Sequence, residues 1–349
     1  MAKTAEHGLR LTKGNFKFRG IVNGVKNKNF YTEQTLSNGT NKRSVNFGVE
    51  YAPKCSVYPT VQGFEKPDVY FGKKDETAKK VPWAQRMTFA AQHPDWRIIG
   101  VNVGLSKGED GKNISSNMTE FDAASYIKGN LQDGMSVFVQ GDLDFRSYVN
   151  KNGEARRKVN FNATQVSLCT YEIDFESEKF NPTGANTFEQ EIIYSGIEKE
   201  TDENNKQTGR FILSGYVVSY SAIEPVSFIV KDANIANIIR KNLKPYSSIV
   251  CSGWVEVVHS VEDVQEVDDW GQPIPKEFKK VTAQTTTEMV VGYVDPSTID
   301  TDSFSEEKIA EGIKKLKAKA NAKKNYGEVD EQVSVPTADN SVWDEDDWK

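Results

Sequence analysis

The chain has 349 residues, of which 27% are charged and 37% apolar, and its formal net charge is −6 at pH 7. This length accommodates two domains and a tail, and the composition is that of an ordinary globular protein. The three cysteines and three histidines are scattered, which excludes a disulfide framework and a clustered zinc site and favours a reducing compartment.

The charge is distributed unevenly along the chain. Residues 1–170 hold 25 Lys and Arg against 16 Asp and Glu, whereas residues 171–304 hold 11 against 23. Residues 305–327 are basic again, with 7 against 3, and residues 328–349 are acidic, with 1 against 8. A basic first half suggests a polyanionic partner, and an acidic second half suggests a different role.

The first half is predicted to be mainly β. Apolar residues alternate at period two in residues 14–22 and 44–51, and residues 96–103 read as another strand. Residues 119–131 are predicted to form a short helix. The two strands SVFVQGDLDFRSYV and EARRKVNFNATQVSL then flank the turn NKNG at 150–153, which predicts a long hairpin.

One part of this pattern occurs twice. Residues 121–144 align without gaps on residues 233–256. Upstream, FKFRGIV matches IIYSGIE, and KRSVNFGVEY matches GRFILSGYVV. The order of strands and helix recurs as a whole, which predicts a tandem duplication. The identical pairs in the aligned windows are Ala124/Ala236, Ile127/Ile239, Asn130/Asn242, Leu131/Leu243, Ser136/Ser248 and Gly141/Gly253.

Five strands with a helix between the third and the fourth are the order of an OB-fold, a five-stranded Greek-key barrel that binds oligonucleotides or oligosaccharides. We therefore predict a mainly β protein with two tandem OB-fold modules. The basic first module covers 1–170, with an aromatic-rich insertion at 52–95, and the acidic second module covers 171–297. A basic helix is predicted at 303–325 and a disordered acidic tail at 326–349.

No sequence motif of an enzyme is present: there is no phosphate-binding loop, nucleophile elbow, zinc-protease motif or calcium loop. The acidic stretch EDVQEVDD at 262–269 is the one cluster that a metal-dependent nuclease or annealing factor could use, and we interpret it as a solvated loop. We therefore expect no enzymatic activity, no metal and no cofactor.

Aromatic and basic residues instead alternate through the first module. Single-stranded nucleic acid requires this pairing, because bases stack on rings while Lys and Arg follow the phosphates. We assign Phe16, Phe18, Phe47, Phe138 and Phe161 to the core. The candidate contact residues are Lys17, Arg19, Arg43, Trp83, Arg86, Trp96, Arg97, Phe145, Arg146, Tyr148, Lys151, Arg156, Arg157 and Lys158.

Two of these stretches carry a resemblance. Trp96-Arg97-Ile98 opens a strand before the predicted helix, and VQGDLDFRSY at 139–148 leads into the glycine turn and a basic return strand. In these features and in its acidic C-terminal end the chain resembles the bacterial and phage single-stranded DNA-binding protein family. The resemblance implies stacking by Trp96 and Tyr148, a backbone contact by Arg146, and a tail that recruits replication and repair enzymes.

The chain departs from that family in four ways, one of which is the large insertion at 52–95. It carries two modules, so a monomer or a small homo-oligomer can suffice. Its tail ends in Lys349 instead of an apolar residue. Its second module has Val257, Val258 and Ser260 at the positions of the first module's rings and arginine. We therefore expect the second module to bind DNA poorly and to serve as a scaffold, in oligomerisation, or to keep the tail off the groove.

The leading hypothesis is a sequence-independent single-stranded DNA-binding protein, of a phage, that acts in DNA replication, recombination and repair. It is expected in the host cell cytoplasm and away from membranes, because no apolar run is long enough to span one. The alternative is a tandem OB-fold adaptor that binds no nucleic acid, and DNA and RNA are not distinguished. The residues expected to bind partner proteins are Trp343, Asp344, Glu345, Asp346, Asp347 and Trp348.

Overall fold

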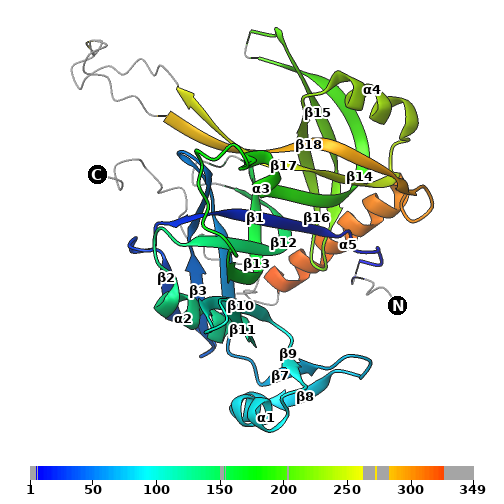
Figure 1. Cartoon of the computed structure of the whole chain (residues 1–349). Coiled ribbons are helices and arrows are strands. Elements are labelled where there is room, and N and C mark those ends of the chain that lie inside the picture. Colours follow the sequence, from blue (N-terminus) through cyan, green and yellow to red (C-terminus); the bar gives the residue numbers. More distant parts are fainter. Residues whose placement is uncertain are drawn as a thin grey trace.

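The structure is a computed structural model that describes residues 5, 7–149, 153, 155–202, 204–261, 272 and 283–325. Within these residues, strands dominate (Figure 1): fifteen of them join into one large mixed sheet, and three form a separate small sheet. The predicted fold class, mainly β, is confirmed. The predicted tail and its partner-binding residues lie outside the described part of the chain, as does the acidic stretch at 262–269.

The strands of the first half close into a ring, which we call the first barrel. β1 pairs with β4 and β12, β3 pairs with β6, β6 runs parallel to β13, and β13 returns to β12. The predicted strand at 44–51 is divided between β3 and β4. The bounds are β1 (Gly14–Asn23), β3 (Asn41–Asn46), β4 (Gly48–Ala52), β6 (Pro59–Phe64), β12 (Ser136–Val149) and β13 (Ala155–Leu168).

Shorter elements complete the first barrel. β2 extends the sheet beyond β3, β5 pairs with β4, and the β10–β11 hairpin joins the sheet because β10 runs parallel to β13. The helix predicted at 119–131 is confirmed as α2, and Thr119 caps its start by accepting a hydrogen bond from the backbone N–H of Asp122. The bounds are β2 (Tyr31–Thr35), β5 (Cys55–Val57), β10 (Val101–Lys107), β11 (Asn113–Met118) and α2 (Glu120–Asn130).

A cluster of phenylalanines fills the first barrel. The rings of Phe16 and Phe18 lie 4.5 Å apart between centroids, and Phe161 meets both edge-on. These three and Phe47 are buried, as predicted. Phe138 is a correction: it is only half-buried, and its ring faces the Arg19 guanidinium on the outside of the barrel.

The insertion folds as a small sheet with its own core. It leaves the barrel after β6 and returns at β10, so the expected bounds of 52–95 are corrected, because β6 belongs to the barrel. The strand expected at 96–103 is likewise divided between the small sheet and β10. The elements of the insertion are β7 (Asp68–Gly72), β8 (Lys79–Pro82), the 3-10 turn Trp83–Gln85, α1 (Arg86–Gln92) and β9 (Arg97–Ile98).

The second half forms a second ring of pairings, the second barrel. β14 pairs with β15, β15 with β16, β16 runs parallel to β18, β18 pairs with β17, and β17 returns to β14. In chain order, the helix α4 follows the third strand, β16, and precedes the fourth strand, β17. The bounds are α3 (Pro182–Ala185), β14 (Asn186–Thr201), β15 (Gln207–Val218), β16 (Ile223–Val230), α4 (Ala233–Asn242), β17 (Ser248–Val261) and β18 (Ala283–Asp300).

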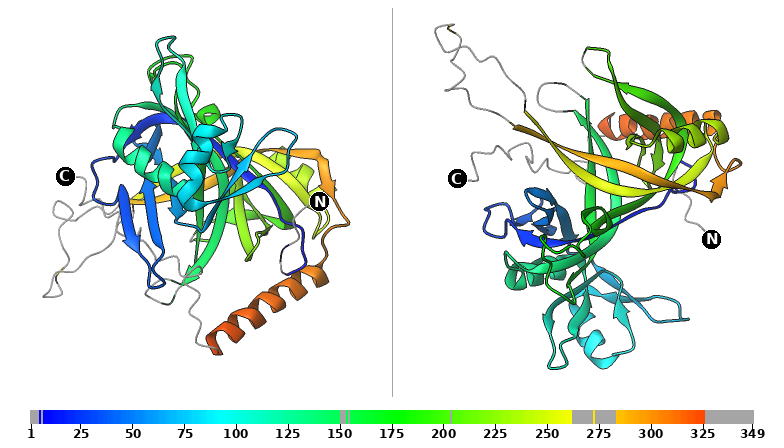
Figure 2. Two further views of the ribbon diagram at one scale, coloured as in Figure 1. Left: turned by 90° about the horizontal axis from the view of Figure 1, so that it is seen from below. Right: turned by 45° about the horizontal axis from the view of Figure 1, so that its top comes forward.

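The two barrels are joined through their backbones. β1 pairs antiparallel with β14, from Gly14 opposite Gln190 to Phe18 opposite Asn186. One sheet therefore runs from the second barrel through β14 and β1 into the first, as Figures 1 and 2 show. The buried residues of both barrels also form one continuous apolar cluster, so the two barrels pack as a unit.

The C-terminal helix α5 (Glu306–Asn325) lies against the second barrel (Figure 2). Phe304 and Ile309 are buried in an apolar cluster with Leu9, Val218 and Ile223. The predicted basic helix at 303–325 is thus present, and its first half docks on β16.

Candidate nucleic-acid interface

The candidate interface begins on a two-stranded arm. Among the residues that the structure describes, β12 has no partner on β1 beyond Asp142 and pairs there with β13 alone. We call this distal hairpin, residues 142–149 and 155–162, the arm. Residues that stand directly opposite each other on two strands point to the same face, so the register of the arm sorts its side chains into two faces.

One face of the arm packs against the second barrel. The ring of Phe145 meets the ring of Phe228 with centroids 6.0 Å apart. Ser147 Oγ donates a hydrogen bond to Glu224 Oε2 at 2.5 Å, and Arg157 Nη1 donates to Ser227 Oγ at 3.5 Å. Phe145 and Arg157, both expected to contact DNA, therefore help to hold the arm on β16.

The other face of the arm carries the cations and the ring. Tyr148 stands opposite Arg156, and Arg146 stands opposite Lys158. We call these four residues the arm face. Tyr148 is 39% exposed, and Arg156 and Lys158 are exposed as well. A ring among three cations can stack a base while the cations contact its phosphates.

Two acids lie on the same face, Asp142 and Asp144, and Asp144 is engaged by Arg146. Asp144 accepts a hydrogen bond from Arg146 Nε at 2.9 Å, and Asn160 stands opposite it. The pair is partly exposed, so its stabilising contribution is small. Arg146 is held in position by this contact and keeps 38% of its side chain exposed.

The arm face continues into a polar surface across β13, β6 and β3. Asn162 stands opposite Thr60, Thr60 opposite Asn46, and Gln62 opposite Ser44. Because Val45, Val61 and Phe161 at the alternate positions are buried inside the barrel, these amides and hydroxyls face outward. β3 and β6 follow β1 in the first barrel, so this surface corresponds in strand order to the strand 2–3 face by which OB-folds bind ligands.

At the far end of this surface Lys42 lies against Phe64. The Lys42 Nζ stands 5.8 Å from the centroid of the Phe64 ring, and the lysine is only 8% exposed. Burial lowers the pKa of Lys42 below its ordinary value. Sequence reasoning did not select Lys42, because only the pairing of β3 with β6 brings it to Phe64.

Lys17 and Arg19 lie on the outer face of β1, as the alternation predicts. Both are exposed, and the Arg19 guanidinium lies 5.5 Å from the centroid of Phe138. Lys17 stands opposite Gln140 on one side and Thr187 on the other. It lines an open groove of about 470 Å³ that crosses from β1 to β18 and also contains Trp254.

The placement of Trp96 is a correction. It is only 7% exposed and packs in the core of the insertion with Phe71 and Val81. The Nζ of Lys79 covers its ring at 4.2 Å. A ring so enclosed offers almost no surface to a base, because the insertion uses it as the core residue of a small sheet.

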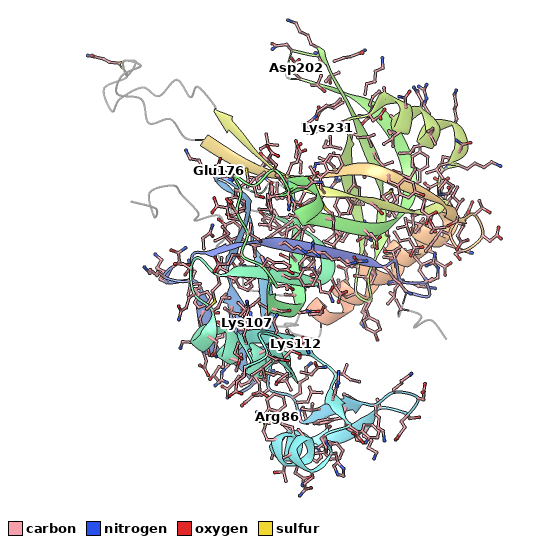
Figure 3. The ribbon with its side chains drawn as sticks, viewed as in Figure 1. Arg86, Lys107, Lys112, Glu176, Asp202 and Lys231 are labelled. Atoms are coloured by element: carbon pink, nitrogen blue, oxygen red, sulfur yellow. The ribbon has the colours of Figure 1, made fainter. Side chains whose placement is uncertain are left out.

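Trp83, through the ring of Phe121, and Arg86, through Asp122, attach the insertion to α2. Arg86 is labelled in Figure 3. The Arg86 guanidinium donates two hydrogen bonds to Asp122, at 2.8 and 2.9 Å, and lies 4.1 Å from the Trp83 ring centroid. Burial opposes ionisation of Asp122, but the hydrogen bonds from Arg86 and Thr119 prevail and hold its pKa below the ordinary value. Trp83 and Arg86, which were expected to contact DNA, therefore serve to hold the insertion against α2.

Arg43 is engaged in a similar way. Its guanidinium lies 4.0 Å from the centroid of Phe121 on α2, and it pairs with Glu33 at 2.8 Å. Arg97 is exposed on the open face of the small sheet. Lys151, which falls between β12 and β13 in the sequence, lies outside the described residues. The structure thus brings Arg146, Tyr148, Arg156 and Lys158 together, and the other candidates among the described residues lie outside this face.

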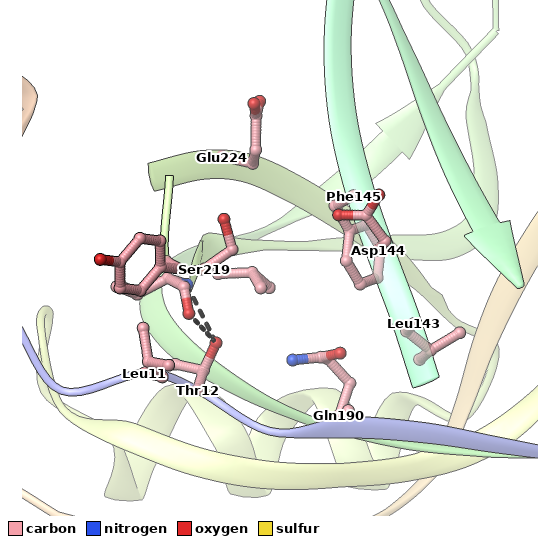
Figure 4. A pocket seen from close by; sticks show the side chains of 12 residues that line it. Leu11, Thr12, Leu143, Asp144, Phe145, Gln190, Ser219 and Glu224 are labelled. Atoms are coloured by element: carbon pink, nitrogen blue, oxygen red, sulfur yellow. Dashed lines mark hydrogen bonds between the residues drawn. The ribbon is translucent and has the colours of Figure 1, made fainter. Parts of the chain in front are cut away.

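A small cavity of about 200 Å³ lies where the arm meets the second barrel (Figure 4). It is lined by Leu143 and Phe145 from the arm, Gln190 from β14, and Val217 and Glu224 from the second barrel. It is smaller than an ordinary ligand pocket, and we read it as a packing gap between the two barrels.

Among the described residues, no group of His, Cys, Asp and Glu side chains is arranged to hold a metal ion. None of the helices in that part of the chain is long and apolar enough to cross a membrane.

Several solved structures are similar to the chain. Wild-type single-stranded DNA binding protein from Thermus aquaticus aligns over 82% of this chain and 93% of its own, at 10% identity and a TM-score of 0.37. A deletion mutant of that protein gives the same score over 94% of its own chain. Small single-stranded DNA-binding protein from Streptomyces coelicolor aligns over 44% of this chain and 93% of its own, at 14% identity and a TM-score of 0.19.

No curated protein sequence matches the chain. One family model does: residues 13–327 match the family described as YorF. This match covers most of the length, and the chain belongs to the YorF family.

Proposed function

We propose that the chain is a sequence-independent single-stranded DNA-binding protein that binds through the arm face and the adjoining polar surface. The observation that carries the proposal is the pairing of Tyr148 with Arg156 and of Arg146 with Lys158 on one exposed side of the arm. Stacking on a ring is worth about 1–3 kcal/mol per base and is indifferent to sequence. Duplex DNA hides its base faces, so this surface suits a single strand.

The proposal includes two OB-fold modules in tandem, with bounds of 1–170 and 171–297. Residues that align between the two halves make equivalent contacts in each half. The Asn130 and Asn242 amides each donate to the carbonyl four residues earlier, at 2.7 and 2.8 Å. Gly141 and Gly253 each mark a register shift, and a Cβ on either would stand under 2 Å from a backbone oxygen on the next strand. These matches support duplication.

In this proposal the second module is a scaffold that binds DNA poorly. Three of its acids are paired internally: Arg210 binds Glu200 at 2.7 Å and Glu288 at 2.9 Å, and Lys231 binds Glu256 at 2.5 Å. Lys231 is seen on the second barrel in Figure 3. Residues 171–304 still hold 23 acids against 11 bases, and this excess of negative charge repels phosphate, so the strand is expected to favour the first module.

We further propose a role in phage DNA replication, recombination or repair, in the host cell cytoplasm, as a monomer or small homo-oligomer. The acids at 344–347 and the rings of Trp343 and Trp348 would recruit partner enzymes, because rings can fill an apolar pocket while acids meet its basic rim. Deleting 340–349 is expected to leave DNA affinity equal or higher and to abolish partner recruitment.

The test is a fluorescence titration of labelled oligo-dT, a matched duplex and matched RNA at two salt concentrations. The wild type should prefer the single strand, and binding should weaken with salt because phosphate contacts release counterions. Tyr148→Ala should weaken binding by about 1–3 kcal/mol, whereas Tyr171→Ala, which removes a ring that is 83% exposed outside the arm, should not. Absence of single-strand binding at low salt would favour the adaptor hypothesis, to which the acidic second half also points.

A further inference from the structure

The C-terminal helix α5 divides into a docked half and an exposed half. Ile309 and Gly312 are buried, and Ile313 and Leu316 pack against the same apolar cluster. From residue 317 to residue 321 every side chain is exposed. The helix is therefore anchored by its first three turns and projects beyond the second barrel with its last turns.

The projecting half is strongly basic. The sequence KKLKAKANAKK at 314–324 holds six lysines and no acid. Ala, Lys and Leu are good helix formers, and lysines near the C-terminus complement the helix dipole, so the segment continues the docked helix beyond Leu316. Leu316 is the last residue of the segment that packs on the second barrel, and Lys315 pairs with Glu311 at 2.8 Å. Beyond Leu316 the side chains of residues 317–321 are exposed, so the lysines there present their charge to the surroundings.

The helix and the arm share one strand of the second barrel. A Cβ on Gly312 would stand 2.7 Å from Ile223 Cδ1, so α5 lies directly on the start of β16. Arg157 of the arm reaches Ser227, four residues along the same strand, which is about 13 Å at the usual rise per residue. In Figures 1 and 2 the C-terminal end of α5 and the arm lie on the same side of the molecule.

We infer that the exposed lysines within residues 314–321 form a second phosphate-contacting element, which extends the cationic surface of the arm along α5. The inference rests on the proposed function, because its ligand is the strand that the arm face binds. It assigns the contact to the backbone of a nucleic acid: the lysines are point charges on flexible stems without a ring among them, which suits phosphates and not bases. The second barrel then contributes to binding through its helix although its own surface is acidic.

The test compares two full-length variants with the wild type on labelled oligo-dT, over sodium chloride concentrations from about 50 to 200 mM. The first variant carries Lys314→Gln, Lys315→Gln and Lys317→Gln, which keep helix propensity. The matched control carries Lys206→Gln, Lys241→Gln and Lys244→Gln, three exposed lysines elsewhere on the second module. Circular dichroism should show equal helix content in all three proteins.

Three phosphate contacts to a single strand contribute about 2 to the slope of log affinity against log salt. For the first variant, the slope of log affinity against log salt should be shallower than that of the wild type by about 2. It should also bind at least severalfold more weakly at low salt, while the control should behave like the wild type. Equal slopes for the first variant and the control would overturn the inference and leave the proposed function standing. Absence of any binding by the wild type would remove both.

Discussion

The Oε1 atom of Gln190 lies 1.7 Å from the point where a Cβ atom on residue 14 would stand. Gly14 and Gln190 are directly opposite each other where the two barrels join. The Gln190 side chain is 1% exposed, and its amide donates to the carbonyl oxygens of Lys13 and Glu191. Residue 14 must therefore be glycine for β1 and β14 to pair in this way.

Gly14→Ala should destabilise the joint between the barrels by about 1–3 kcal/mol, because the added methyl group displaces a buried side chain. Urea denaturation would measure the free energy of unfolding. Gly129→Ala is the matched control, since a Cβ there meets nothing within 4 Å and the residue lies in helix α2. The control should gain up to about 1 kcal/mol, and equal losses in both variants would contradict the role of the Gly14–Gln190 contact.

Trp96→Ala should damage the insertion and spare DNA binding. Removing a buried Trp costs about 3–5 kcal/mol, and the loss should fall on the small sheet of β7, β8 and β9. Hydrogen exchange of the Phe71 and Ile98 amides would report the local opening, and an oligo-dT titration would report affinity. A loss of affinity with unchanged exchange would restore Trp96 as a contact residue.

Arg86→Ala should release the insertion from α2. The variant loses two charge-assisted hydrogen bonds to Asp122 in a pair that is mostly buried, which should cost about 1.5–3 kcal/mol. Limited proteolysis should then cleave the connections at 65–67 and 99–100 faster than in the wild type. Arg97→Ala, in the same insertion but exposed, should leave cleavage unchanged, and equal cleavage of both variants would argue against the attachment.

Acid should weaken the contact between α5 and the second barrel through Asp300. Hydrogen bonds from the Ser303 side chain and the Asp302 backbone, with the nearby charge of Arg10, lower the pKa of Asp300 to about 2. A carboxyl group whose pKa is lowered in the folded state stabilises that state at pH values above its ordinary pKa near 3.9. This stabilisation is lost as the pH falls toward about 2.

The difference in unfolding free energy between the wild type and Asp300→Asn should therefore be largest near neutral pH and shrink between about pH 4 and pH 2. Urea titrations at several pH values would measure it. Asp295→Asn is a suitable comparison, because this neighbouring acid of β18 has no contact with Arg10 among the described interactions. A constant difference across this range would contradict the assignment.

Local patterns predicted the elements whose cause is local. The capping Thr119 and the apolar spacing that follows it are visible in the sequence, and α2 forms there. The pattern of residues 96–103 predicted one strand, but the chain passes from the small sheet to the first barrel between Ile98 and Val101. Alternation of apolar residues cannot indicate which sheet a strand joins.

Predicting the candidate site required knowledge of long-range strand pairing to a greater extent than predicting the individual elements did. Alternation in the hairpin places Arg146 and Tyr148 on one face, and the basic return strand supplies Arg156 and Lys158. Which face meets solvent is decided by Phe228 and Glu224, some 80 residues away in the chain, because they cover the opposite face. Trp96 was misassigned for the same reason: the burial of a ring depends on neighbours that a family resemblance does not supply.

The joint between the barrels carries a consequence for how such a chain could evolve. Extending the match of FKFRGIV to IIYSGIE by two residues aligns Gly14 with Gln190, the same two residues that face each other across the joint. In an assembly of two identical subunits, a residue on the symmetry axis meets its own copy, so two glycines would leave a hole and two glutamines would collide. Covalent fusion removes that constraint, because each half can mutate independently. An asymmetric contact between one small residue and one large residue can then evolve.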